Sequence, residues 1–252
     1  MTLVTSTAAY FAFIFLLAGA VKGVVGLGMP TVAMGLLSLR MPPAEAAALL
    51  LLPSFITNVW QLAEGSRLGS LIRRLWPTLL ATFVSTVVSA GVIASAKSAV
   101  AIAALGGALL LYAAAGLFNF HVNVSLHAER WAGPLVGTVT GFITGVTGTF
   151  VVPAVPYLVG LGLTRDVLVQ ALGLSFTVST VALGIGLLWH DALKLQAVTN
   201  SAIAVMPALL GMIAGARIRR HVSPERFRRW FFVGLGLLAA QLIYGQVATM
   251  RP

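Results

Sequence analysis

Two long apolar stretches of this chain are each interrupted by a glycine-rich run that ends near a proline. The first run spans 22–31 and reads KGVVGLGMPT, and the second spans 144–153 and reads TGVTGTFVVP. The glycines with matching spacing are Gly23 and Gly26 in the first run and Gly145 and Gly148 in the second. Interrupted hydrophobic segments at corresponding places in two halves are typical of transporters, where they form the substrate site. The pair therefore predicts both a duplicated fold and the place where a solute binds.

The composition places the chain in a membrane. Of its 252 residues, 59% are hydrophobic and 9% are charged, whereas soluble domains carry roughly 25% charged residues. The net charge of +10 could indicate a nucleic-acid partner. The basic residues, however, stand in short loops between apolar runs, where they set membrane orientation. We therefore predict a multi-pass protein surrounded by lipid bilayer, with no separate soluble domain and no nucleic-acid partner.

The apolar residues fall into eight runs. These are 8–39, 44–63, 76–96, 99–118, 132–162, 167–188, 196–216 and 230–248. A bilayer crossing takes about 20 residues, so six of the runs fit one transmembrane helix each. The first and fifth runs are longer, and they are the two with glycine-rich interruptions. Each of them is either one tilted, broken crossing or a hairpin of two half-helices.

Short matches between the halves indicate an internal duplication. Ser54 and Ser175 are each followed by phenylalanine, and Pro77 and Pro207 each stand two residues before a Leu-Leu pair. Each half therefore consists of one broken or hairpin segment and three transmembrane helices. The predicted division is a first repeat at 1–118, a linker at 119–131 and a second repeat at 132–252.

The arginine-rich loops exchange places between the halves. In the first half they follow the second apolar run, at 67–74, and in the second half they follow the seventh run, at 217–229. Repeats of equal orientation would keep such loops in place, whereas inverted repeats exchange them. Inversion requires an odd number of crossings per half, which holds when each broken segment is a hairpin. We therefore predict an all-α membrane protein of two inverted repeats, with both termini outside the cytoplasm.

Hairpins also separate the charges better than single crossings do. They collect most basic residues on one face and leave few on the other. The rich face holds Arg67, Arg73, Arg74, Arg130, Arg165 and the six arginines of 217–229, and the poor face holds Arg40, Lys97, Lys194 and Arg251.

Lys22 is the only charged residue of the first interrupted segment. At the tip of a hairpin it lies near the bilayer centre, where a lysine costs roughly 2.5–3.5 kcal/mol on insertion scales. A water-filled cavity, an anionic ligand or a carboxylate could offset that cost, and no carboxylate lies within its own run. We predict that Lys22 binds an anion. The alternative is that the helix starts later and the side chain reaches the membrane interface.

The interruptions themselves suit anions. Glycine lets the backbone open, and the N-terminus of a half-helix offers N–H groups and positive partial charge. The threonines of the second run add hydroxyl donors. The predicted substrate-binding residues here are Gly23, Gly26, Gly28, Thr144, Gly145, Thr147, Gly148 and Thr149. The alternative is that these small residues let helices pack closely.

Polar side chains in the helices that follow extend this set. The first group is Ser54, Thr57, Asn58 and Gln61, and the second is Ser175, Thr177, Ser179 and Thr180. Helical spacing places Ser54, Asn58 and Gln61 on one face of the first helix. It also places Ser175 and Ser179 on one face of the second. We add Ser54, Asn58, Ser175 and Ser179 to the predicted binding site. Hydrogen bonding between helices is the alternative.

The sequence offers little support for an enzyme or a metal-binding protein. The chain has no cysteine, which excludes disulfides and thiolate sites. The four histidines stand in or beside loops without metal-ligand spacing, and no GxxxxGK[ST] motif for ATP occurs. Ser175 with His190 lacks the second glycine of a nucleophile elbow. We expect no catalytic residue, no metal and no cofactor.

The ordered motifs resemble the sulfite exporter TauE/SafE family, also called the toluene-sulfonate uptake permeases. Its repeats open with a pattern near GxxGxGGG followed by proline, and a Gly-Ala-Arg signature comes late. The matching residues are Gly23, Gly26, Gly28, Pro30, Gly145, Gly148, Pro153, Glu45-Ala46 and the segment 211–217. The triple glycine is eroded in both copies, and the late signature is absent from the first half. The resemblance covers nearly the whole chain.

The resemblance implies a transporter of the bacterial inner membrane for sulfite, sulfonates or related organic anions. Combined with the residues above, it predicts a secondary transporter that works by alternating access. An anion-selective channel is the alternative, and a non-transporting membrane scaffold is a third hypothesis. The sequence leaves open whether the protein forms a homo-oligomer.

Overall fold

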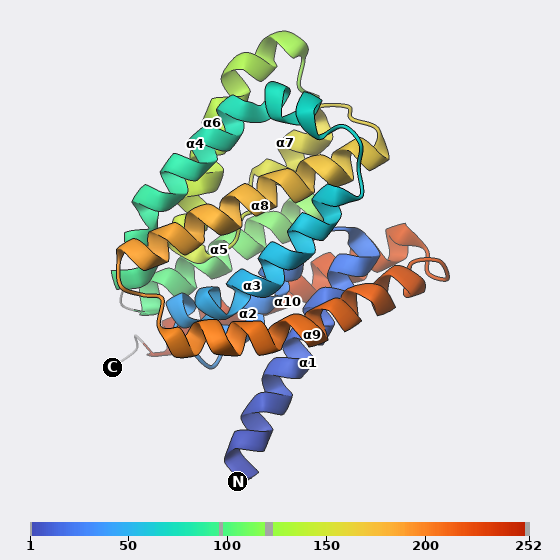
Figure 1. Ribbon diagram of the computed structural model, residues 1–252. Coiled ribbons are helices and arrows are strands. Elements are labelled where there is room, and N and C mark those ends of the chain that lie inside the picture. The colour runs from blue at the N-terminus through green and yellow to red at the C-terminus, as the bar shows by residue number, and fades with distance from the viewer. Residues whose placement is uncertain (1, 96–97, 119–122, 250–252) are drawn as a thin grey trace.

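The computed structural model describes residues 2–95, 98–118 and 123–249, and these form α-helices without any strand. The helices run side by side in one bundle, and the N-terminal end of α1 extends beyond it (Figure 1). Their bounds are α1 Thr2–Val25, α2 Met29–Leu37, α3 Pro43–Ala63, α4 Leu68–Ser95, α5 Ser98–Leu117, α6 Leu126–Thr147, α7 Ala154–Gly160, α8 Arg165–Trp189, α9 Leu195–Ile218 and α10 Pro224–Thr249. The all-α prediction is confirmed.

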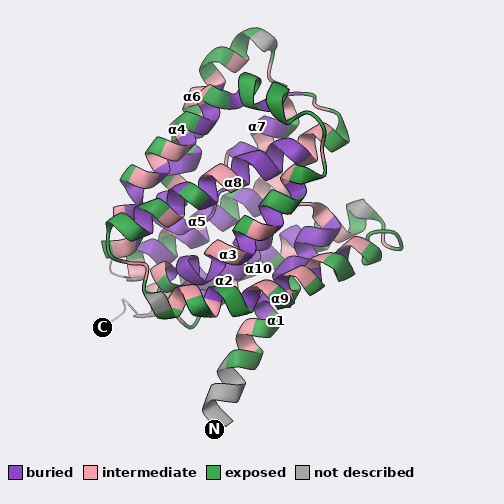
Figure 2. Cartoon of the chain, in the orientation of Figure 1, coloured by how far each residue is buried: buried purple, intermediate pink, exposed green. Residues whose placement is uncertain are grey.

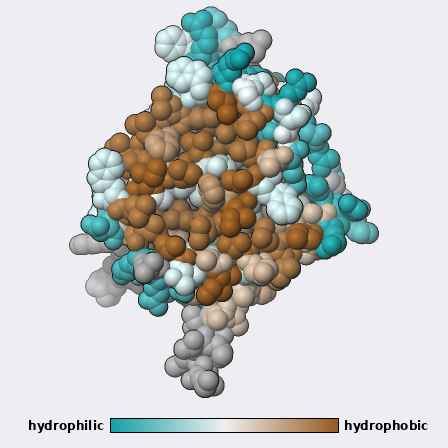
Figure 3. All heavy atoms as spheres, in the orientation of Figure 1, coloured by the Kyte–Doolittle hydropathy of each residue, from teal (hydrophilic) through white to brown (hydrophobic). Residues whose placement is uncertain are grey.

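Six helices of the described residues are long and apolar enough to cross a bilayer. They lie in α1, α3, α4, α5, α8 and α9. Buried residues line the inward faces of the helices and exposed ones line the outside (Figure 2). Many of the exposed residues are large and apolar, such as Phe13, Val88 and Leu111. The face drawn in Figure 3 is broadly hydrophobic, with hydrophilic residues along its borders. Such a surface suits lipid, and the protein is a multi-pass membrane protein.

Both interrupted segments fold back on themselves. The hydroxyl of Tyr10 in α1 donates to the carbonyl of Leu36 in α2 (2.8 Å). The backbone N–H of Val124, just before α6, donates to the carbonyl of Gly160 at the end of α7 (3.0 Å). Each pair therefore forms a hairpin that returns toward its own start. The alternative of one broken crossing is wrong, because the short second helix runs back beside the first.

Helices of one half pack mainly on helices of the other half, in a reciprocal pattern. The long arm of each hairpin packs on the third helical segment of the other half, so that α1 lies on α9 and α6 lies on α4. The second segments, α3 and α8, pack on each other, as do the last ones, α5 and α10. Each half thus has one hairpin and three further helices. Of those six further helices, all but α10 are among the candidate membrane spans of the described residues. The division at 119–131 stays a prediction, although α6 already begins inside this segment, at Leu126.

Glycines let the helices approach each other closely at two of these interfaces, that of α6 with α4 and that of α1 with α9. On α6, glycines recur at every fourth position against α4, and a Cβ on Gly141 would lie 2.4 Å from the carbonyl oxygen of Thr82. On α1 and α9, a Cβ on Gly211 would lie 2.1 Å from the carbonyl oxygen of Leu16. The α6 glycines are Gly133, Gly137, Gly141 and Gly145. Small residues at this spacing let membrane helices approach each other closely.

The arginine-bearing segments of both halves meet at one end of the bundle. The backbone N–H of Arg67 donates to Gln170 Oε1 of α8 (2.9 Å), and Arg74 of α4 pairs with Glu129 of α6. The start of α8 and the loop after α9 border one cavity through Arg165 and Arg219. This end is the basic face predicted from the sequence. Lys97 and Arg251 of the opposite face lie outside the described residues.

Candidate functional site

The first break separates α1 from α2 at Gly26–Gly28. The N–H of Gly26 donates to the carbonyl of Lys22 (2.7 Å), which closes the last turn of α1. Gly28 has a φ of 101° and precedes α2, with Pro30 in the first turn. A Cβ at Gly28 would lie 3.1 Å from Phe231 Cζ. Only glycine combines this left-handed conformation with so little space, so the sharp turn depends on it.

Lys22 lies in the last turn of α1 and is only 4% exposed. Its ammonium donates to Thr57 Oγ1 (3.1 Å) and to Asn58 Oδ1, both on α3. Asn58 Nδ2 in turn donates to Thr180 Oγ1 on α8 (3.3 Å). In the described part of the chain no carboxylate pairs with Lys22. The result is a buried positive charge held by neutral acceptors, an arrangement that is costly without a further anionic partner.

A cavity of about 560 Å³ opens from Lys22 to the arginine-rich end. Its wall comes from the ends of α1, α3 and α9 and from the starts of α8 and α10, and it includes Gly23 and Gly26. Exposed arginines stand at its mouth, namely Arg165, Arg217, Arg219, Arg220 and Arg228. Among the described residues that line it, Glu64 is the only carboxylate. Clefts lined by one sign of charge concentrate ions of the opposite sign, so this cavity favours anions.

Gln61 joins the break to α8 on the same wall. Its Nε2 donates to the carbonyls of Gly26 (3.0 Å) and Val169 (3.1 Å). Its Oε1 is buried and has no hydrogen-bond partner among the described residues. A buried polar atom without a partner requires an explanation, and bound water or ligand is the usual one.

The other polar side chains predicted for the site lie off this wall. Ser54 Oγ is buried without a hydrogen-bond partner in the described residues, and Ser179 Oγ donates to the carbonyl of Ser175 in its own helix (3.0 Å). All three serines are buried in the bundle. Of the first polar group, Thr57 and Asn58 accept hydrogen bonds from Lys22, and Gln61 borders the cavity.

The second break is packed shut. Gly148, with a φ of 72°, ends α6, and a Cβ there would lie 2.8 Å from Met34 Cε. The hydroxyls of Thr147 and Thr149 bond each other (2.9 Å), and Thr144 Oγ1 donates to the carbonyl of Thr140 (2.7 Å). These threonines are at most 2% exposed. The five second-break residues predicted to bind substrate are absent from the described lining of the Lys22 cavity.

The expectation of free glycine N–H groups needs correction. The N–H of Gly26 and that of Gly148 each donate within the preceding helix, to Lys22 and Thr144 (both 2.7 Å). Gly23 and Gly145 lie inside α1 and α6, where helical hydrogen bonds engage the backbone. Both pack against a neighbouring helix: a Cβ would lie 2.2 Å from the Met212 carbonyl oxygen and 2.1 Å from Ser89 Oγ, respectively. The alternative of close helix packing therefore holds for these two glycines.

Sequence reasoning missed the arginines at the cavity mouth, because it interpreted them only as orientation signals. One signal was available. Gly211 and Gly215 repeat the spacing of Gly19 and Gly23, which indicates that α1 and α9 pack together. Arg217, two residues after Gly215, then had to lie near the end of α1 and hence near Lys22.

Comparison with known proteins gives one finding. The family described as "Sulfite exporter TauE/SafE" matches residues 11–242. No curated protein and no solved structure matches. Because the match covers most of the chain, the chain belongs to the TauE/SafE sulfite exporter family, whose members are membrane transporters and not enzymes. The family resemblance predicted from the sequence is confirmed.

Proposed function

We propose that this member of the TauE/SafE family is a secondary transporter of a small sulfur oxyanion, such as sulfite or an organosulfonate. The observation that carries the proposal is the buried ammonium of Lys22, whose partners among the described residues are all neutral and which stands at the inner end of an arginine-rimmed cavity. The family match supports a sulfur anion as the cargo.

Lys22 fits the role of the charged ligand. An ammonium has three donors, and Thr57 and Asn58 accept two of them. The third remains for an oxygen of the anion. Charge-assisted hydrogen bonds to sulfite or sulfonate oxygens are about twice as strong as neutral ones. The arginines at the mouth would raise the local anion concentration, and Lys22 would bind the anion after it has left bulk water.

We infer that the two repeats are inverted. The exchanged basic loops and the exchanged packing of α1 on α9 and of α6 on α4 support this arrangement. Basic loops face the cytoplasm, so the arginine-rich end would face the cytoplasm of a bacterial inner membrane and both termini would lie outside. The cavity then opens inward.

The contrast between the two breaks supports alternating access. The first break borders an open cavity, whereas the second is closed. In the opposite state, movement of one repeat against the other would close the first and open the second. The closed second break favours this carrier over an anion-selective channel, which needs a path open to both sides at once.

Transport assays in proteoliposomes test the proposal. We expect saturable sulfite or sulfonate flux and counterflow in the wild type. Lys22→Ala is expected to lower flux about 100-fold, because it removes a charge-assisted contact at the anion. Lys22→Arg keeps the charge and is expected to retain part of the flux.

Lys194→Ala is the matched control, since it removes an exposed lysine of the opposite face. It should transport as the wild type does. Wild-type flux in a correctly inserted Lys22→Ala variant would refute the role of Lys22. Large anion currents without counterflow would refute the carrier and favour a channel.

A further inference from the structure

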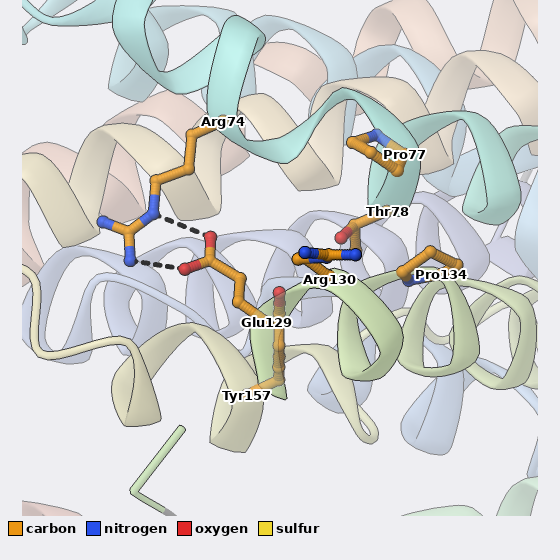
Figure 4. Close-up of a pocket in the computed structure, with 7 residues that line it drawn as sticks. All are labelled: Arg74, Pro77, Thr78, Glu129, Arg130, Pro134 and Tyr157. Carbon is orange, nitrogen blue, oxygen red and sulfur yellow. Dashed lines mark hydrogen bonds and ion pairs between the residues drawn. The ribbon is translucent and has the colours of Figure 1, made fainter. Parts of the chain in front are cut away.

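A second basic pocket lies away from Lys22, between the N-terminal ends of α4 and α6. It has a volume of about 340 Å³ and shares no described lining residue with the Lys22 cavity. Arg130, Thr78 and Tyr157 line it together with Arg74, Glu129 and two prolines, Pro77 and Pro134. Figure 4 shows Arg130 between Thr78 and Tyr157, with both prolines on the Thr78 side. The transport proposal makes no use of this pocket.

Of the two arginines that line this pocket, only Arg74 is paired with a carboxylate among the described residues. Arg74 Nε and Nη2 donate to the two carboxylate oxygens of Glu129 (2.7 and 2.8 Å), as the dashed lines in Figure 4 show. This bidentate pair neutralises Glu129. Arg130 has no carboxylate partner among the described residues. The pocket therefore carries one unmatched guanidinium next to two hydroxyls, a donor set that suits a phosphate oxygen cluster.

Neighbouring side chains place the pocket at the membrane surface. Trp76 and Trp131, next to Pro77 and Arg130 in the sequence, are 57% and 74% exposed. Tryptophans of this kind mark the level of lipid headgroups. One helical turn further along each helix stand Leu80 and Leu135, also exposed. Along each helix the side chains change from charged to tryptophan to leucine, which is the order in which a phospholipid changes from headgroup to interface to acyl chain.

The corresponding place in the other half lacks this chemistry. Aligning Gly23 with Gly145 sets Ala8 opposite Arg130, and Pro207 corresponds to Pro77. A cavity of about 620 Å³ exists there too, but Phe11, Phe15 and Leu210 line it and no charged side chain does among the described residues. The basic pocket is therefore a property of one half and not a consequence of the shared fold.

We propose that the pocket binds the headgroup of an anionic phospholipid, with Arg130 contacting the phosphate and the acyl chains lying along Leu80 and Leu135. The glycine-lined contact between α6 and α4 below the pocket leaves no room for a chain between the helices, so the lipid stays on the outer surface. Basic pockets between transmembrane helices on the cytoplasmic side bind anionic headgroups in this way.

The test measures thermal unfolding of the full-length protein in detergent during titration with phosphatidylglycerol, phosphatidylethanolamine or inorganic phosphate. A ligand that binds the folded state raises its melting temperature. We expect phosphatidylglycerol to stabilise the wild type, with weaker effects of the other two. Arg130→Gln should raise the half-saturating lipid concentration about tenfold, and Arg130→Lys should lie between.

Arg73→Gln is the matched control, because Arg73 neighbours Arg74 but does not line the pocket. It should respond to lipid as the wild type does. If Arg130→Gln and Arg73→Gln weaken the lipid response equally, the lipid is attracted by the basic surface in general and not by this pocket, which would overturn the proposal. Equal stabilisation by inorganic phosphate would overturn the lipid, and equal stabilisation by phosphatidylethanolamine would overturn the selectivity for anionic lipid. Because the readout is not transport, these results are independent of the role of Lys22.

Discussion

The two breaks have similar sequences but opposite surroundings. At the first, Lys22 reaches across to α3 and borders an open cavity. At the second, Thr144 occupies the corresponding position and satisfies its hydroxyl on its own helix, through the carbonyl of Thr140. A threonine can be buried at little cost because a backbone acceptor lies within reach, whereas an ammonium needs partners from elsewhere. The comparison teaches that the repeat supplies the backbone turn, and a single side chain then decides whether the turn is a charged site.

Placing a carboxylate beside Lys22 should most strongly reduce the difference between the two breaks, because it neutralises the charge at the first. Asn58→Asp would give the ammonium an internal anion in place of its amide acceptor. We expect the KM for sulfite to rise about tenfold or more, because substrate must now compete with a fixed ion pair. Asn58→Ala should raise it less.

The matched change at the second break is Thr144→Ala, which we expect to leave KM near the wild-type value. A KM for Asn58→Asp no higher than that for Asn58→Ala would show that the anion does not bind at Lys22.

The packing that both breaks share can be tested by stability. Gly23→Ala and Gly145→Ala each bring a Cβ within 2.2 Å of a neighbouring helix. We expect each to lower the free energy of unfolding by about 1–3 kcal/mol, the usual cost of overpacking. Gly107→Ala, with no atom within 4 Å of its Cβ, is the control. The measurement is denaturation in detergent. If only one of the two variants loses stability, the two interfaces are not equivalent.

The arginines at the mouth should have the smallest effect. Replacing Arg219 and Arg220 together by glutamine should raise the KM about threefold at low ionic strength, because the two charges attract the anion from a distance. High salt should reduce the difference, since exposed charges are screened within about 10 Å at 0.1 M. Arg73→Gln, at the same end but off the cavity, is the control. A loss that salt does not reduce would indicate direct contact with substrate.

Several features of the fold could be predicted because they follow from local chemistry. The positive φ of Gly28 and of Gly148 requires glycine, and prolines follow both breaks, so the interruptions were visible in the sequence. The hairpin was predicted from the distribution of arginines, which reflects membrane orientation. The spacing of Ser54, Asn58 and Gln61 correctly indicated a polar helix face, although only Asn58 and Gln61 reach the site.

Other features depended on contacts between distant segments. Gly23 and Gly26 look alike in the sequence, yet the first is a packing residue inside α1 and the second ends the helix. That difference arises from α9, which lies against Gly23 and is distant in the sequence. The same holds for Arg217 and its neighbours, whose position at the cavity mouth depends on the pairing of α1 with α9.

By itself, the sequence determined a helical membrane protein with two interrupted segments and one lysine within the first of them, because hydropathy, glycine and charge act locally along the chain. Only the tertiary structure decided that the first break opens to a basic cavity while the second is closed, and that a separate basic pocket lies between α4 and α6. Those outcomes depend on which helices touch, and helix contacts in a membrane are set by the complementary shapes of surfaces far apart in the sequence.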